Sequence, residues 1–286
     1  MLQIRFIGRL YSVLLILKDS SVTGRVVDYF LFLANSYNYN LGYWYIYHKL
    51  IKFTDGKHFR YVIQEVFLNK VYSFFSEKNK PVIIDIGANI GVTSLYFKDL
   101  FPKSKIFAFE PNPIAYTLLV RNKEINKVSG LYTFNIAVTS QEKSATIDFY
   151  ISNESVVSTA IKDYRDERFL FKKIKVKSIS FKKIIASFKF IDLLKVDVEG
   201  SEYGYINTLV QNADKIDAFI IEFHVKDLNQ FKKNIKKLLK KYLLWNTLYV
   251  EDRTEITEES LNSIVKDRNV TVCGKLRTST INSSFF

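Results

Sequence analysis

The chain has 286 residues, 48% of them hydrophobic, enough for one large domain or for a domain with an extension. It contains no run of about 18 uninterrupted apolar residues, so the sequence predicts no membrane span. The single cysteine, Cys273, excludes an intrachain disulfide and a multi-cysteine zinc site. We therefore expect a protein of the reducing cytoplasm.

The net charge of +13 raises the question of a nucleic-acid or anionic membrane partner. In the lysine-rich stretch 231–242, however, apolar residues at helical spacing occupy one face and lysines the other. Between Lys173 and Lys177, lysines alternate with Ile174 and Val176, as on a half-exposed strand. Solvated surfaces account for the charge, and we expect no nucleic-acid partner. Peripheral contact with a membrane stays open.

Residues 1–80 are rich in aromatic side chains and are predicted to form an N-terminal extension of helices and one hairpin. Within it, residues 50–59 are typical of two short strands around an Asp55-Gly56 turn. A core domain is predicted over residues 81–286.

From residue 81 onward, strand and helix patterns alternate, which favours an α/β fold: a mostly parallel, doubly wound sheet with helices on both faces. Strands are predicted at 82–86, 105–110, 131–138, 191–197, 218–223, 248–250 and 270–272. Helices are predicted at 92–100, 113–127, near 201–211 and over the lysine-rich stretch. An irregular excursion, 142–180, contains strand-like pieces at 145–151 and 174–179.

The most informative motif joins the first predicted strand to its helix and reads Asp85-Ile86-Gly87-Ala88-Asn89-Ile90-Gly91. Glycines at these two positions allow a sharp turn and a close approach of the backbone to a ligand. The next strand ends in Glu110, 19 residues beyond Gly91. In nucleotide-binding folds an acidic residue there binds the ribose hydroxyls. The sequence therefore predicts an adenosine-containing cofactor.

The identity of the cofactor is narrowed by what the motif lacks. A dinucleotide fold would show Gly-x-Gly-x-x-Gly with a helix N-terminus directed at a pyrophosphate. Here a carboxylate, Asp85, comes just before the turn, which suits a cationic head better than two phosphates. The ammonium and sulfonium of S-adenosylmethionine fit this chemistry, with Asp85 holding the ammonium directly or through water.

Polar residues also follow the other predicted strands, at the edge of the sheet where ligands bind in open α/β folds. Together with Asp85 and Glu110 they are Asn112, Asn135, Asp197, Glu199, Glu222 and His224. Burying a carboxylate costs several kcal/mol unless something compensates it. This repeated placement therefore indicates a functional site.

Five segments in this order resemble the FkbM family of S-adenosylmethionine-dependent methyltransferases: 82–91, 107–113, 135–138, 194–202 and 220–224. The most diagnostic are Glu110-Pro111-Asn112-Pro113 and Asp197-x-Glu199-Gly200-x-Glu202. The resemblance covers about half of the chain and implies a Rossmann-like class I methyltransferase, often acting on hydroxyls of sugars or related metabolites. The cofactor-binding residues that we expect are Asp85, Gly87, Asn89, Gly91, Glu110, Asn112 and Ala137.

A hydroxyl acceptor needs a base or a metal, because the neutral alcohol is a poor nucleophile. We expect Asp197, Glu199 and His224 to be the catalytic residues, with His224 or Asp197 taking the proton. Alternatively, Asp197 with Glu222 or His224 holds a divalent cation that lowers the pKa of the hydroxyl. Glu202 is expected to be structural.

The predicted function is O-methylation of a sugar, a glycan or a small metabolite. A nucleic-acid methyltransferase is the first alternative. It is weakened because this sequence has neither an Asn/Asp-Pro-Pro-Tyr/Phe segment nor a suitably placed cysteine nucleophile. The second alternative is a non-catalytic binding protein on the same fold, with its aromatic N-terminal region as the partner surface.

Overall fold

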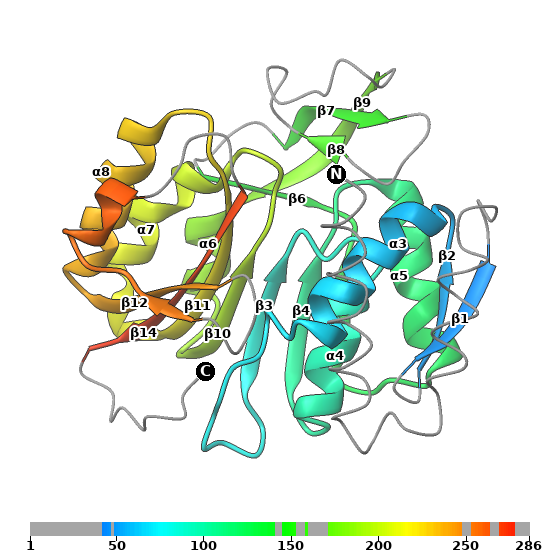
Figure 1. Cartoon of the computed structure of the whole chain (residues 1–286). Helices are drawn as coiled ribbons and strands as arrows, with labels where there is room; N and C mark the ends of the chain where they lie inside the picture. The colour runs from blue at the N-terminus through cyan, green and yellow to red at the C-terminus, as the bar shows by residue number, and fades with distance from the viewer. Residues whose placement is uncertain are drawn as a thin grey trace, which may run out of the picture.

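The computed structural model describes residues 42–46, 49–140, 145–152, 158–159, 171–247, 253–263 and 269–277. Its centre is an eight-stranded, mostly parallel sheet with helices on both faces (Figure 1). This confirms the predicted fold class. Among the described residues, no helix is both long and apolar enough to cross a membrane.

The strand order of the main sheet is β13-β12-β14-β11-β10-β3-β4-β5. The bounds are β3 (Val82–Ile86), β4 (Lys105–Phe109), β5 (Leu131–Phe134), β10 (Ile191–Val196), β11 (Ile216–His224), β12 (Tyr242–Thr247), β13 (Thr254–Glu255) and β14 (Asn269–Leu276). The five strands from β5 to β11 are parallel, and β14 runs antiparallel between β11 and β12. The chain order reverses between β3 and β10. A ligand site is therefore expected beyond the carboxyl ends of these two strands.

Helices cover the two faces of the sheet as separate layers (Figure 1). One layer holds α3 (Gly56–Ile63), α4 (Val92–Leu100) and α5 (Pro113–Ile125), and the other holds α6 (Phe181–Ala186), α7 (Ile206–Gln211) and α8 (Leu228–Leu239). Adjacent strand residues alternate between them: Ile83 and Leu193 pack in the first core, Ile84 and Leu194 in the second. Short helical turns complete the connections: the π-helical η1 (Gln64–Leu68) and the 3-10 turns η3 (Glu202–Tyr205), η4 (Ala213–Lys215) and η6 (Ser260–Ser263).

The lysine-rich helix α8 is amphipathic, as predicted. Its apolar residues Phe231, Ile235 and Leu238 are fully buried against the second core. The helix ends at Leu239, and the buried Tyr242 begins β12, a strand that the sequence pattern did not reveal. The strand predicted at 248–250 lies outside the described residues.

A second, four-stranded sheet covers the carboxyl end of the main sheet, in the order β6-β9-β7-β8 (Figure 1). Its strands are β6 (Ala137–Thr139), β7 (Thr146–Ser152), β8 (Ser158–Thr159) and β9 (Phe171–Ser180). The prediction of one strand over 131–138 was therefore wrong. The side-chain amide of Asn135 donates to the carbonyls of Glu110 (2.8 Å) and Pro111 (3.1 Å), where the chain leaves β5 for β6.

The hairpin of the extension lies earlier in the chain than predicted. β1 (Gly42–Ile46) pairs antiparallel with β2 (Lys49–Phe53). Asp55 does not form a hairpin turn, because its side chain accepts a hydrogen bond from the His58 backbone N–H (2.9 Å) and caps the N-terminus of α3. An Asp-Gly pair can form a hairpin turn or begin a helix, and in this structure it begins α3.

Two asparagines, Asn122 in α5 and Asn126 at its C-cap, hold the hairpin against the core. Asn122 accepts from the Lys52 N–H (2.7 Å) and donates to the Lys52 carbonyl (3.1 Å). Asn126 forms the same pair of bonds with Leu50, at 2.9 and 2.8 Å. These side-chain amides satisfy β2 backbone groups as a neighbouring strand would. Phe53 and Phe59 complete the attachment by packing into the first core.

Candidate active site

A cleft opens beyond the carboxyl ends of β3, β4 and β10, where the topology predicts a ligand site. Of the predicted cofactor-binding residues, Gly87, Asn89, Glu110 and Ala137 line it. The small sheet adds the apolar side chains of Val138 and Phe149. We refer to this space as the cofactor cleft.

Glu110 is held in the cofactor cleft by two backbone hydrogen bonds. Its Oε2 atom accepts the Asn89 N–H (2.8 Å), and its Oε1 atom accepts the Asn112 N–H (2.7 Å). Burial raises the pKa of Glu110 to about 7, against the lowering effect of these two hydrogen bonds. Each carboxylate oxygen keeps a lone pair, so the group can accept two further hydrogen bonds from a ligand.

Gly87 and Gly91 meet different steric demands. Gly87 has φ +79°, and a Cβ there would lie 1.7 Å from the backbone oxygen of Asp197. Only glycine lets the β3 turn approach the end of β10 this closely. Gly91 has φ +89° and packs against Leu119, where a Cβ would come within 2.5 Å of Cδ1. Gly87 thus lines the cleft, whereas Gly91 shapes the start of α4.

Asp85 does not line the cofactor cleft. Its side chain is fully buried and accepts a hydrogen bond from Ser94 Oγ (2.6 Å). Its second oxygen lies 3.3 Å from the Lys195 ammonium, which also donates to the Gly87 carbonyl (2.7 Å). Asp85 is therefore placed to support the Gly87 turn through Lys195. Sequence reasoning missed Lys195, although a lone lysine inside the buried strand 191–196 is itself a signal of a buried charge pair.

Asn112 also acts beside the cleft rather than in it. It caps α5 by accepting the Ile114 N–H (3.0 Å), and its own N–H holds Glu110. Pro113 follows at the first helical position, as predicted.

A second cavity of about 280 Å³ adjoins the cofactor cleft, and we call it the acceptor cavity. It is lined by His58, Tyr61, Val62, Glu65, Val66, Tyr72, Gly87, Ala88, Asn89, Ile90, Val92, Thr93, Lys195, Asp197, Glu199, Glu222, His224 and Asn269. Its first six residues come from the region before the core domain. Sequence reasoning missed all six, because their spacing follows the helices of the extension and matches no motif.

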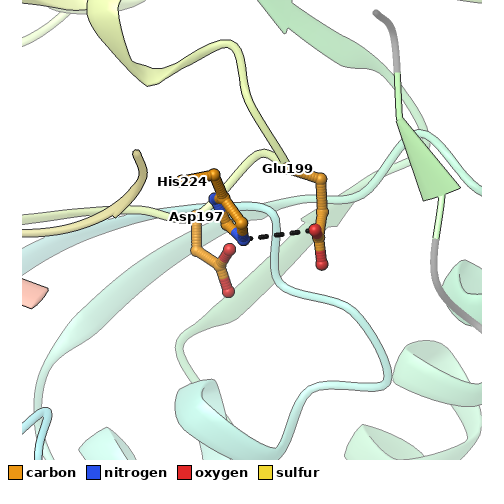
Figure 2. A group of neighbouring side chains, drawn as sticks. All are labelled: Asp197, Glu199 and His224. Carbon is orange, nitrogen blue, oxygen red and sulfur yellow. Dashed lines mark ion pairs between the residues drawn. The ribbon is translucent and has the colours of Figure 1, made fainter. Parts of the chain in front are cut away.

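The two spaces meet at the predicted catalytic residues. Asp197 and Glu199 line both, together with Gly87 and Asn89. One carboxylate oxygen of Asp197, one of Glu199 and one ring nitrogen of His224 all lie within 4.8 Å of one another. Figure 2 shows the three side chains. The structure thus brings the three predicted catalytic residues together.

His224 lies between two carboxylates. Its Nε2 atom is 3.2 Å from Glu199 Oε2, and its Nδ1 atom is 2.9 Å from Glu202 Oε1. Burial by itself would lower the pKa of His224, but the hydrogen bonds that its ring donates to Glu199 and Glu202 raise it to about 12. The ring is therefore an imidazolium at neutral pH, and the prediction that His224 takes the proton does not fit this geometry.

Glu202 has a definite place in this arrangement. Its Oε1 atom accepts both the Gly200 N–H (2.8 Å) and His224 Nδ1, and its side chain is fully buried. The expected structural role therefore extends to fixing the orientation of the His224 ring.

Glu222 faces the acceptor cavity from β11, apart from the three-residue cluster. Its oxygens accept from Tyr72 OH (3.3 Å) and from Asn269 Nδ2 (3.0 Å). Burial and the neighbouring Asp197 raise the pKa of Glu222 well above its ordinary value. Among the described residues, the side chains close enough together to bind one metal ion are Asp197, Glu199 and His224, and Glu222 is not one of them.

The strand order, the antiparallel β14 and the acidic residue at the end of β4 define a Rossmann-like methyltransferase. Residues 85–260 match the family model described as the methyltransferase FkbM domain. The match spans more than half of the chain, and the protein belongs to this family.

Two known proteins of similar sequence, both named as methyltransferases, agree with this assignment. The chain is 30% identical over 179 residues to Methyltransferase 1 of Beauveria bassiana, covering 57% of this chain and 72% of that relative. It is 25% identical over 177 residues to 2-O-methyltransferase NoeI of Sinorhizobium fredii, covering 57% and 71%. A crystal structure of methyltransferase FkbM from Methylobacillus flagellatus superposes with a TM-score of 0.43 at 13% identity, covering 70% of this chain and 44% of that one.

Proposed function

We propose that this protein transfers a methyl group from S-adenosylmethionine to a hydroxyl of a sugar, a glycan or another small metabolite. The observation that carries the proposal is the junction of the two spaces at Asp197 and Glu199. A donor in the cofactor cleft and an acceptor in the neighbouring cavity would meet at these side chains. Such an arrangement supplies the alignment that an in-line displacement requires.

The residues of the cofactor cleft fit an adenosine-containing donor. Glu110 has two free lone pairs for ribose hydroxyls, and Ala137, Val138 and Phe149 offer an apolar wall for the base. The Oδ1 atom of Asn89 is buried, with no donor among the described residues. This acceptor suits the ammonium of the cofactor better than Asp85, whose oxygens face Ser94 and Lys195.

When bound, S-adenosylmethionine supplies the electrophilic methyl group, and the protein supplies position and charge. We propose that Asp197 is the general base that accepts the proton of the acceptor hydroxyl, because its side chain is partly exposed and lines both spaces. The imidazolium of His224 orients Glu199 beside it. General-base catalysis of this kind contributes about 10²- to 10⁴-fold to the rate.

Asp197, Glu199 and His224 also fit a divalent cation that takes the place of the His224 Nε2 proton. A histidine that binds a metal usually donates its other ring N–H to a carboxylate, and His224 Nδ1 makes such a contact with Glu202. A cation held there would lower the pKa of the acceptor hydroxyl, whereas in its absence Asp197 acts alone. Methyl transfer measured in EDTA and with added Mg²⁺ decides between the two.

The oxygen acceptor is supported by the name of one relative, which is called a 2-O-methyltransferase. We retain a cytoplasmic location, in keeping with the free, buried thiol of Cys273.

Calorimetric titration with S-adenosylmethionine, S-adenosylhomocysteine and NAD tests the cofactor. We expect binding of the first two alone, and we expect Glu110→Ala to abolish it. Glu124→Ala, an exposed position on α5, is the matched control and should bind as the wild type does. Binding of NAD, or of none of the three, contradicts the proposal.

A further inference from the structure

The acceptor cavity holds two cations, and each is already matched by two carboxylates. The Lys195 ammonium lies 3.3 Å from Asp85 and 3.6 Å from Asp197. The His224 ring lies between Glu199 and Glu202. Both cations attract Glu65 at longer range, and His224 attracts Glu222, which lowers the pKa of these two carboxyl groups, but among the described residues neither cation lies within ion-pair distance of them.

Two more carboxylates face the same cavity, and neither is paired with a cation. Glu222 is 8% exposed, and its hydrogen-bond partners among the described residues, Tyr72 OH and Asn269 Nδ2, are neutral. Glu65 extends from η1 and makes no side-chain hydrogen bond or ion pair with the described residues. Burial and the nearby Asp197 raise the pKa of Glu65 to about 7. With raised pKa values, these carboxyl groups tend to keep a proton in the free protein, and a ligand of opposite charge would stabilise their ionised forms.

Aromatic side chains from the same region complete this wall. Tyr61 and Tyr72 line the cavity, and the Tyr72 ring lies 5.8 Å from the Lys195 ammonium. Aromatic faces beside carboxylates form a favourable surface for an ammonium group. The cavity of about 280 Å³ lies near the lower limit of small-molecule sites, so it suits one ring-sized molecule.

We propose that the acceptor carries an ammonium group as well as its hydroxyl, and that Glu65 and Glu222 bind that ammonium while Asp197 faces the hydroxyl. The chemical class is an amino sugar or an aminocyclitol. This inference rests on the proposed function and narrows its acceptor. Glu65 and Tyr72 lie outside the residues that match the family model, so this specificity belongs to the chain's own extension.

The test compares amine-bearing molecules with their neutral counterparts. Glucosamine and glucose, galactosamine and galactose, and 2-deoxystreptamine and scyllo-inositol are titrated into the full chain saturated with S-adenosylhomocysteine. We expect the amine of at least one pair to bind about 10- to 100-fold more tightly, the range of a charge-assisted contact. Glu65→Gln and Glu222→Gln should each remove most of that preference and leave the affinity for S-adenosylhomocysteine unchanged. Glu124→Gln is the control.

The possible results separate the two proposals. If no amine binds more tightly than its partner, or if the preference survives in both glutamine variants, the ammonium site is refuted. The same holds if EDTA abolishes the preference or Mn²⁺ alone creates it, because the cation of the cavity is then a metal. If S-adenosylhomocysteine itself does not bind the wild type, the proposed function fails, and this inference fails with it.

Discussion

Replacing Lys195 by methionine should destabilise the protein strongly, because Lys195 is the only cation contacting Asp85 among the described residues. The side chains of Lys195 and Asp85 are 3% and 0% exposed, and their charged atoms lie 3.3 Å apart. Removing one partner of such a buried pair leaves an uncompensated charge and typically costs about 3–5 kcal/mol. The Gly87 carbonyl also loses its 2.7 Å hydrogen bond from Lys195. We therefore expect the upper part of this range.

Urea unfolding followed by circular dichroism measures this free energy. The double variant Asp85→Asn/Lys195→Met removes both charges, and it should recover more than half of the lost stability. Lys236→Met is the matched control, since Lys236 is 55% exposed and pairs only loosely with Glu258 at 3.5 Å. It should cost less than about 1 kcal/mol. A loss below about 1 kcal/mol for Lys195→Met, or no recovery in the double variant, would refute this account of Asp85.

Three further outcomes follow from the site. Gly87→Ala should abolish S-adenosylhomocysteine binding in calorimetry, because its Cβ would lie 1.7 Å from the Asp197 oxygen; binding at wild-type affinity would contradict the turn geometry. Asp197→Asn should lower kcat by about 10²- to 10⁴-fold while changing the Kd of the cofactor only a few-fold, and an unchanged kcat would remove Asp197 as the base. Since the pKa of Glu110 is raised to about 7, its ionised form, the better acceptor for ribose hydroxyls, predominates only above that pH. Affinity for S-adenosylhomocysteine should rise as pH increases through about 7 and then level off, and titrations over pH that show a flat profile would exclude this role.

The sequence predicted the order of the core elements well, because its strands are short, buried and apolar. β3 and α4 occupy the predicted residues, Val82–Ile86 and Val92–Leu100. Local ambiguity caused the errors: Asp55-Gly56 suits a hairpin turn as well as a helix cap, and Asn135 lies inside an otherwise continuous strand pattern.

Some residues of the candidate site could be predicted from the sequence, and others could not. Glu110 and Asp197 could be predicted because each follows a buried strand in a recognisable motif, and both line the cofactor cleft. The roles of Asp85 and His224 could not, because each depends on contact with a partner that is distant in sequence: Lys195 for the first, and Glu199 with Glu202 for the second. Glu65 reaches the acceptor cavity only through the packing of the extension, which no spacing in the sequence encodes.

The most direct test of the central claim is a crystal structure of the protein with S-adenosylhomocysteine. The account predicts the ribose hydroxyls on the Glu110 carboxylate and the sulfur at the junction of the two spaces, directed toward Asp197. A cofactor bound away from Glu110, or with its sulfur facing away from the acceptor cavity, would contradict it.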